Sequence, residues 1–260
     1  PGCVPQIRDD VWNIEHPAYV IPIRRLMNLK KRTLGFRKKG LRYHWNIPAS
    51  SKLILSFCAR DDIIEDIWTR QFDAWDDEGH NFWETLKTYN FDAVLSLDYS
   101  CFVNYPRMDH LMAMKRNIIT AGRLAEQGIP VILDVMAFCD EDFDRFVLWG
   151  REQGMQWYNI NYQKTKKVPW VLDLISKKCA RILELVPDAK IMVMGVGDAE
   201  RTGILLNRFP GKLAISTSNL LMHSQYKRVY SETDHRWIRL GVSCDEAFRR
   251  NLAIYNKLGK

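Results

Sequence analysis

The sequence predicts an α/β protein of the (β/α)8 TIM-like barrel type, with a basic N-terminal segment and a helical insertion after the first clear strand. Three observations predict this class. Short apolar segments alternate with amphipathic ones from residue 53 onward, seven or eight such units fit into 260 residues, and several apolar segments show no polar alternation. Parallel strands covered on both faces have this pattern. Seven or eight units in this length favour a closed barrel.

Each expected strand is short and is followed by polar residues. In chain order, the expected strands are Leu53–Cys58, Ala93–Asp98, Pro130–Val135, Trp157–Tyr162, Lys190–Gly195, Lys212–Ser216 and Trp237–Gly241. Residues Tyr19–Ile23 could supply an eighth strand. We therefore divide the chain into a basic N-terminal arm, residues 1–48, which could contribute one strand, and a single α/β barrel domain, residues 49–260.

The intervening segments have helical spacing. In Met108–Gln127, we expect the core face to consist of Met108, Leu111, Met112, Ile118 and Ile119. Trp170–Val186 has a similar apolar face. Asp140 and Asp198 stand where N-caps belong, and Ser243 with Glu246 makes a capping box.

The longest insertion, Asp61–Asn90, predicts two helices. It is rich in tryptophan and acidic residues, and includes Trp68, Trp75 and Trp83. Tryptophans at this density indicate packing, with ligand binding as the alternative.

Composition limits the classes of protein that fit. No apolar run approaches the roughly 18 residues of a membrane span, and no secretory leader is visible at the start. The six cysteines form no CxxC pair and no Cys/His cluster with zinc spacing. We therefore expect a cytoplasmic protein with no membrane partner and no zinc site.

The net charge of +7 is concentrated in one segment. Nine basic residues and no acidic residue lie between positions 24 and 42: Arg24, Arg25, Lys30, Lys31, Arg32, Arg37, Lys38, Lys39 and Arg42. Aromatic residues such as Phe36 and Trp45 lie within or beside this segment. This mixture suits phosphate contact with some base stacking, so we predict DNA or RNA as a partner. An inert solvated arm is the alternative.

Candidate catalytic residues follow from the barrel rule that functional side chains project from the carboxyl ends of strands. Asp98 and Asp134 close two consecutive apolar strands, LSLDYS and VILDVM. Such a pair could divide acid and base roles or hold a divalent metal. The alternative is that each carboxylate caps a helix or pairs with a cation.

Candidate ligand-binding residues lie at later strand ends. The segment WYNINYQK would place its amides on one face, and MGVGDAE sets two glycines before a helix N-terminus. An internal polar network, a solvent face or an ordinary turn would explain the same residues. The ligand-binding candidates are Asn159, Asn161, Gln163, Gly195, Gly197, Ser216 and Ser218.

Four strings carry a family resemblance: LSLDYS, MGVGDAERTG, LAISTSN and QYKR. Over roughly residues 53–230, the chain loosely resembles the tRNA-guanine transglycosylases and the relatives that insert 7-deazapurines into DNA. This resemblance implies a barrel that exchanges a base through a covalent intermediate on an aspartate. The chain also looks like an uncharacterised phage and plasmid family, with LDYS, an arginine-bearing helix and a GIPVI strand.

The chain departs from the transglycosylase pattern at three places. Ile215 and Ser216 stand where the nucleophilic aspartate is expected, LILSFCAR lacks the early base-binding aspartate, and the zinc ligands have no counterpart. A serine without a nearby base is a poor nucleophile.

Our leading hypothesis is therefore a mobile-element barrel protein that engages nucleic acid through Arg24–Arg42. It would bind a base or nucleotide near Asp98, Asp134 and Asn161 without standard transglycosylase chemistry. One alternative is a metal-assisted hydrolase or lyase of small molecules that uses Asp61, Asp98 and Asp134. Another is a non-catalytic subunit of a larger assembly, with a protein partner.

Overall fold

The computed structural model describes residues 2–7, 16–28, 33–35, 40–100, 104–162, 170–196 and 198–258. The chain divides into two compact units. The central unit comprises residues 15–155, and the terminal unit comprises residues 1–14 and 156–260.

The central unit carries four strands of the main sheet. Its elements are β2 (Ala18–Pro22), η1 (Ile23–Arg25), β3 (Met27–Asn28), β4 (Thr33–Leu34), α1 (Leu41–His44), β5 (Lys52–Ser56), α2 (Asp61–Arg70), α3 (Phe82–Lys87), β6 (Ala93–Leu95), α4 (Arg107–Glu126), β7 (Val131–Asp134) and α5 (Asp140–Glu152). Strands β2, β5, β6 and β7 pair in parallel, each with the next. Their carboxyl ends therefore lie along one edge.

The terminal unit carries the other four strands and a separate hairpin. Its elements are β1 (Cys3–Pro5), β8 (Trp157–Asn161), α6 (Val171–Leu185), β9 (Lys190–Met194), α7 (Ala199–Arg208), β10 (Leu213–Thr217), α8 (Asn219–Gln225), β11 (Arg228–Ser231), β12 (Arg236–Arg239) and α9 (Cys244–Leu258). Strands β1, β10, β9 and β8 are parallel neighbours. An aromatic cluster that includes Tyr230, Phe248 and Tyr255 packs with Cys3 of β1.

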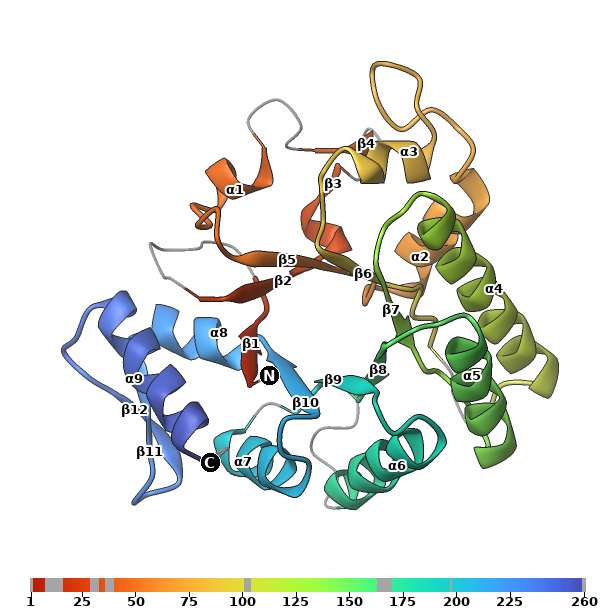
Figure 1. Ribbon diagram of the computed structural model, residues 1–260. Helices are drawn as coiled ribbons and strands as arrows, with labels where there is room; N and C mark the ends of the chain where they lie inside the picture. The colour runs from red at the N-terminus through yellow and green to blue at the C-terminus, as the bar shows by residue number, and fades with distance from the viewer. Residues whose placement is uncertain are drawn as a thin grey trace. The chain divides into compact units, whose positions relative to one another are not determined.

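The strand order is β7-β6-β5-β2 in the central unit and β1-β10-β9-β8 in the terminal unit. Strands alternate with helices along most of the chain (Figure 1). This is the α/β (β/α)8 class that the sequence predicts. The strand expected near Tyr19–Ile23 is present as β2. Among the described residues, no helix combines the length and apolar character that crossing a bilayer requires.

One expected barrel strand is wrong. Residues Trp237–Gly241 do not join the main sheet, because β12 pairs antiparallel with β11 in a hairpin of its own. The position is taken instead by β1, whose three residues pair in parallel with β10. Strand β1 was not predicted, because a segment of three residues that includes a proline is too short to show the periodicity of a strand.

The predicted core face of α4 is also wrong. Met108, Leu111 and Met112 are 65%, 38% and 47% exposed, and Ile118 and Ile119 are half-buried. The buried face combines three polar residues with three apolar ones: His110, Asn117, Thr120, Met114, Ala121 and Leu124. Asn117 and Thr120 can be buried because they donate hydrogen bonds to main-chain carbonyls.

Two of the predicted helix caps agree with the structure and one does not. Asp198 accepts a hydrogen bond from the Arg201 amide at 2.7 Å and caps α7, as expected. Ser243 likewise accepts from the Glu246 amide at 3.1 Å. Asp140 is not a cap, because Cys139 holds that position and Asp140 lies in the first turn of α5.

The insertion after β5 contains the two expected helices, α2 and α3. Trp75 and Trp83 are 0% and 3% exposed, and Trp68 is half-buried. The ring centroids of Trp75 and Trp83 both lie 4.9 Å from that of Phe82. The expected packing role is confirmed for Trp75 and Trp83.

Candidate functional site at the carboxyl ends of β6 and β7

A buried asparagine ties together the carboxyl ends of β6 and β7. Asn117 of α4 is fully buried, and its Nδ2 donates to the carbonyl oxygens of Leu97 at 2.6 Å and Asp134 at 2.9 Å. A second link joins the same strands, because the Asp134 amide donates to Ser96 Oγ at 2.9 Å. Asp98 and Asp134 therefore project from a fixed edge of the central unit.

These two carboxylates differ in burial. Asp134 is 1% exposed, whereas Asp98 is half-buried and lies three residues beyond the end of β6. A buried carboxylate is costly unless hydrogen bonds or a positive charge compensate it. The edge thus offers one enclosed and one accessible carboxylate.

An arginine and two aromatic rings lie beside the loop that follows Asp98. Arg116 Nη1 donates to Glu65 Oε2 at 2.6 Å, and the guanidinium lies over the rings of Trp68 and Tyr99 at 5.4 and 5.5 Å. Burial raises the pKa of Tyr99 well above its usual range, so this phenol stays protonated and can donate a hydrogen bond.

The same loop is fixed against α2. Asp61, the first residue of that helix, accepts a hydrogen bond from the Ser100 amide at 3.2 Å. The chain after β6 is thereby held on both sides, by Asn117 at Leu97 and by Asp61 at Ser100.

A second ion pair lies beyond β7. Arg107, in the first turn of α4, donates two hydrogen bonds to Asp142 of α5, whose side chain is 2% exposed. This pairing lowers the pKa of Asp142 and raises that of Arg107. The same two segments also meet at a ring contact, in which buried His110 of α4 lies 4.5 Å from Phe138, a side chain between β7 and α5 that is 46% exposed. The rim of the site thus combines a fixed cation with an exposed aromatic ring.

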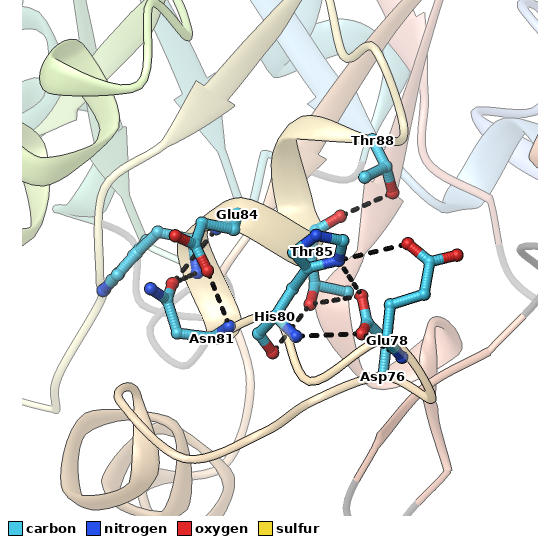
Figure 2. Close-up of polar contacts among 8 residues, drawn as sticks. Asp76, Glu78, His80, Asn81, Glu84, Thr85 and Thr88 are labelled. Atoms are coloured by element: carbon cyan, nitrogen blue, oxygen red, sulfur yellow. Dashed lines mark hydrogen bonds and ion pairs between the residues drawn. The ribbon is translucent and has the colours of Figure 1, made fainter.

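Asp76, Glu78 and His80 form the only group of three potential metal ligands within 4.8 Å among the described residues (Figure 2). Asp76 is already saturated with donors. Its Oδ1 accepts from the amides of Glu78 and His80, and its Oδ2 lies within hydrogen-bond distance of His80 Nδ1 and Thr85 Oγ1. The group therefore orders the loop before α3.

This loop makes stability depend on pH. Burial of Asp76 opposes ionisation, but the hydrogen bonds from His80, Glu78 and Thr85 outweigh it and lower the pKa of Asp76 to about 2. Because the folded-state pKa lies below the ordinary 3.8, this stabilisation is present above about pH 4 and is lost as the pH falls toward 2.

We expect Asp76→Asn to lower the free energy of unfolding by roughly 2 kcal/mol at neutral pH, with the difference shrinking below pH 4. Urea titrations at several pH values measure this difference. The control is Asp77→Asn at the exposed neighbouring position. A wild-type to Asp76→Asn difference that stays constant down to pH 2 would contradict the assignment.

The three aspartates of the metal-assisted alternative do not form a metal-ligand group. Asp61, Asp98 and Asp134 all lie in described segments, but they are not among the residues whose ligand atoms gather within 4.8 Å. Asp61 is engaged with the loop after β6 instead.

The amide candidates of β8 belong to the terminal unit. Asn159 is fully buried, Asn161 is half-buried, and Gln163 lies outside the described residues. Tyr158 is also fully buried, so both faces of this strand are covered. A solvent-facing role for Asn159 is therefore wrong.

The glycine and serine candidates lie on the same unit. Gly195 follows β9 with φ of 96° and lines a small pocket with Tyr162, Val171, Leu172, Ile175, Val196 and Arg201. Gly197 lies outside the described residues. Ser216 is 1% exposed on β10, and its hydroxyl makes no hydrogen bond with any residue that the structure describes. Ser218 stands at the N-cap of α8 but makes no side-chain cap bond.

Three of the nine basic residues lie in described segments. Arg24 is exposed and Arg25 is half-buried, and both lie in η1, which follows β2. Arg42 is engaged within the protein, because its Nη1 donates to the Pro48 carbonyl at 2.7 Å and its Nη2 lies 3.7 Å from Asp92. The other six lie outside the described residues: Lys30, Lys31, Arg32, Arg37, Lys38 and Lys39.

Comparison of this chain with models of known protein families, and with curated proteins, gave no match. The transglycosylase resemblance therefore stays a prediction. Ile215 and Ser216, which stand at the expected position of the nucleophile, are both buried on β10.

The residues that organise the site were not among those predicted from the sequence. Asn117 lies inside a helix and is 20 and 17 positions away from its two partners. Arg107 and Asp142 are 35 positions apart. Only the polar character of the buried α4 face could have indicated the first, and no local pattern signals the second.

Proposed function

We propose that this protein binds DNA or RNA through the segment Arg24–Arg42 and takes a base or nucleotide at the carboxyl ends of β6 and β7. The observation that carries the proposal is the charge pattern: nine basic residues and no acidic residue in one segment of a chain whose remainder is close to neutral. Phosphate groups supply most of the affinity for such segments.

The folded context of the segment supports this role. Strands β3 and β4 pair antiparallel, and the residues between them include Lys30, Lys31 and Arg32. The base of this hairpin is anchored, because Met27 and Leu34 are buried and the Tyr89 hydroxyl donates to the Gly35 carbonyl at 2.6 Å. A two-stranded β-ribbon fits the major groove of a nucleic-acid duplex.

The start of the basic segment and the candidate aspartates lie along the same edge of the sheet in the central unit. Arg24 and Arg25 lie in η1, which follows β2, and Asp98 and Asp134 stand at or beyond the ends of β6 and β7. These strands are parallel in the central unit, so the residues after them share one edge. Carboxylates can accept hydrogen bonds from the amino groups of bases, and Phe138 offers an exposed ring for stacking.

The test neutralises the residues between β3 and β4. We expect Lys30→Gln/Lys31→Gln/Arg32→Gln to abolish most binding to a fluorescent DNA or RNA strand. The slope of log affinity against log salt should shrink by up to about three, at about 0.9 for each phosphate that is no longer neutralised. Fluorescence anisotropy measures both quantities.

The control variant removes three positive charges from exposed positions of the terminal unit: Lys177→Gln/Arg236→Gln/Arg249→Gln. We expect it to leave most of the affinity and most of the salt slope intact. Equal decreases in the two triple variants would show that net charge alone acts, and would remove the segment from the proposal.

A further inference from the structure

The β11–β12 hairpin places two arginines directly opposite each other. Its register pairs Arg228 with Arg239, and both residues are exposed. Like charges at directly opposed positions destabilise a strand pair. In the described part of the chain, no carboxylate forms an ion pair with either guanidinium, so no described residue compensates this repulsion in that way.

Two neighbours extend the positive surface. Lys227 precedes Arg228 and is exposed, and its carbonyl accepts from the Leu240 amide at 2.9 Å, which closes this end of the hairpin. The Arg228 guanidinium lies 5.7 Å from the ring centroid of Tyr226, a side chain that is 59% exposed. Three cations and one accessible aromatic ring therefore gather at one end of the hairpin.

The acidic residues of the same hairpin are engaged at its other end. Glu232 accepts from Lys257 Nζ at 3.0 and 3.1 Å, and Asp234 accepts from Ser231 Oγ at 2.8 Å. Neither carboxylate is available to the opposed arginines without breaking these contacts.

The backbone that carries the arginines is fixed. Fully buried Asn251 accepts from the Tyr230 amide at 2.9 Å and donates to the Arg228 carbonyl at 2.9 Å and to Ser224 Oγ at 3.1 Å. On β12, the ring of Trp237 stacks on His223 with 3.7 Å between centroids. The two strands therefore hold the opposed charges together, as a preorganised anion site requires.

We infer that Arg228, Arg239 and Lys227 bind adjacent phosphates of a nucleic-acid backbone, with Tyr226 available to stack on a base. The choice of nucleic acid as the source of phosphate rests on the proposed function. Guanidinium groups match phosphate oxygens in bidentate geometry, and a phosphate between two arginines cancels their repulsion. Aromatic rings beside such cations favour single strands.

The test is Arg228→Gln/Arg239→Gln in the full chain, measured by fluorescence anisotropy with a labelled single strand and its duplex. We expect the affinity to fall about tenfold or more at low salt, and the slope of log affinity against log salt to shrink by about two, one for each phosphate contact. The matched control is Arg236→Gln/Arg249→Gln, which removes the same charge from exposed positions of the same unit. It should change neither quantity.

The urea midpoint of unfolding is a second measurement, and it separates phosphate binding from a structural role. A residue that supports the fold would lower the midpoint when it is replaced. Because Arg239→Gln removes a like-charge pair, its urea midpoint should equal or exceed that of the wild type while its affinity falls. A lowered midpoint would mean that Arg239 supports the fold, and would overturn the inference.

Three outcomes separate this inference from the proposed function. If the Lys30/Lys31/Arg32 variant weakens binding and the Arg228/Arg239 variant does not, the hairpin site is wrong and the proposed function stands. The reverse result keeps the hairpin site and removes the role of Arg24–Arg42. Binding to phosphatidylserine vesicles with no binding to either nucleic acid overturns both.

Discussion

Replacing Asn117 by alanine should lower the free energy of unfolding by roughly 3 kcal/mol. The buried carbonyl of Leu97 would lose its donor, and the carbonyl of Asp134 would keep only the Met136 amide at 3.1 Å. An unsatisfied buried group costs about 1–3 kcal/mol, and the deleted side chain also leaves a cavity. Urea denaturation followed by circular dichroism measures the change. The control is Asn256→Ala, an exposed position in α9, where we expect less than about 0.5 kcal/mol.

The Asn117 substitution also tests the site itself. Because Asn117 holds the ends of β6 and β7 together, a destabilisation below about 1 kcal/mol, the usual net value of a single hydrogen bond, would mean that the edge does not depend on this amide. Asn117→Leu fills similar space without the donor. If it restores stability, packing rather than hydrogen bonding fixes the edge.

Trp75→Ala should have the largest effect on the fold, a loss of about 3–5 kcal/mol. The Trp75 side chain is fully buried, packs on Phe82, and donates from Nε1 to the Arg70 carbonyl at 2.8 Å. The substitution leaves a cavity beside α3, and the Arg70 carbonyl keeps only its hydrogen bond from the Asp73 amide at 2.8 Å. Thermal and urea unfolding measure the loss.

A tryptophan at the surface provides the comparison for Trp75. Trp170 is 57% exposed before α6, and Trp170→Ala should cost less than about 1 kcal/mol. Similar costs at the two positions would contradict the view that the insertion after β5 folds around Trp75.

The class of the fold could be predicted from the sequence because apolar strands alternate with amphipathic helices over most of the chain. Two strands differ from the prediction, each for its own reason. Strand β1 is three residues long and depends on its pairing with β10, which no local pattern reveals. Residues near Trp237 have strand-like composition, but their partner is β11 in an antiparallel hairpin, and composition cannot identify a partner.

The α4 helix shows why some of the residues predicted to be buried are exposed. Hydrophobicity selected Met108, Leu111 and Met112, yet the buried face contains Asn117 and Thr120. These polar groups are buried because carbonyls distant in sequence, or one turn away, accept their hydrogen bonds. Pairing of this kind is a property of the tertiary structure.

The candidate site was predictable only as a location. The strand-end rule selected Asp98 and Asp134, whereas Asn117 and the pair of Arg107 with Asp142 required the structure. The same holds for Arg228 and Arg239, which lie 11 positions apart and become direct neighbours only through the hairpin register.

The most direct test of the proposed function is the salt dependence of nucleic-acid binding by the wild-type protein. Fluorescence anisotropy with a labelled DNA or RNA strand, measured between about 50 and about 200 mM salt, should show an affinity that falls steeply as salt rises, because bound cations release counterions from phosphates. Binding that is absent, or that does not change with salt, would contradict the proposed function.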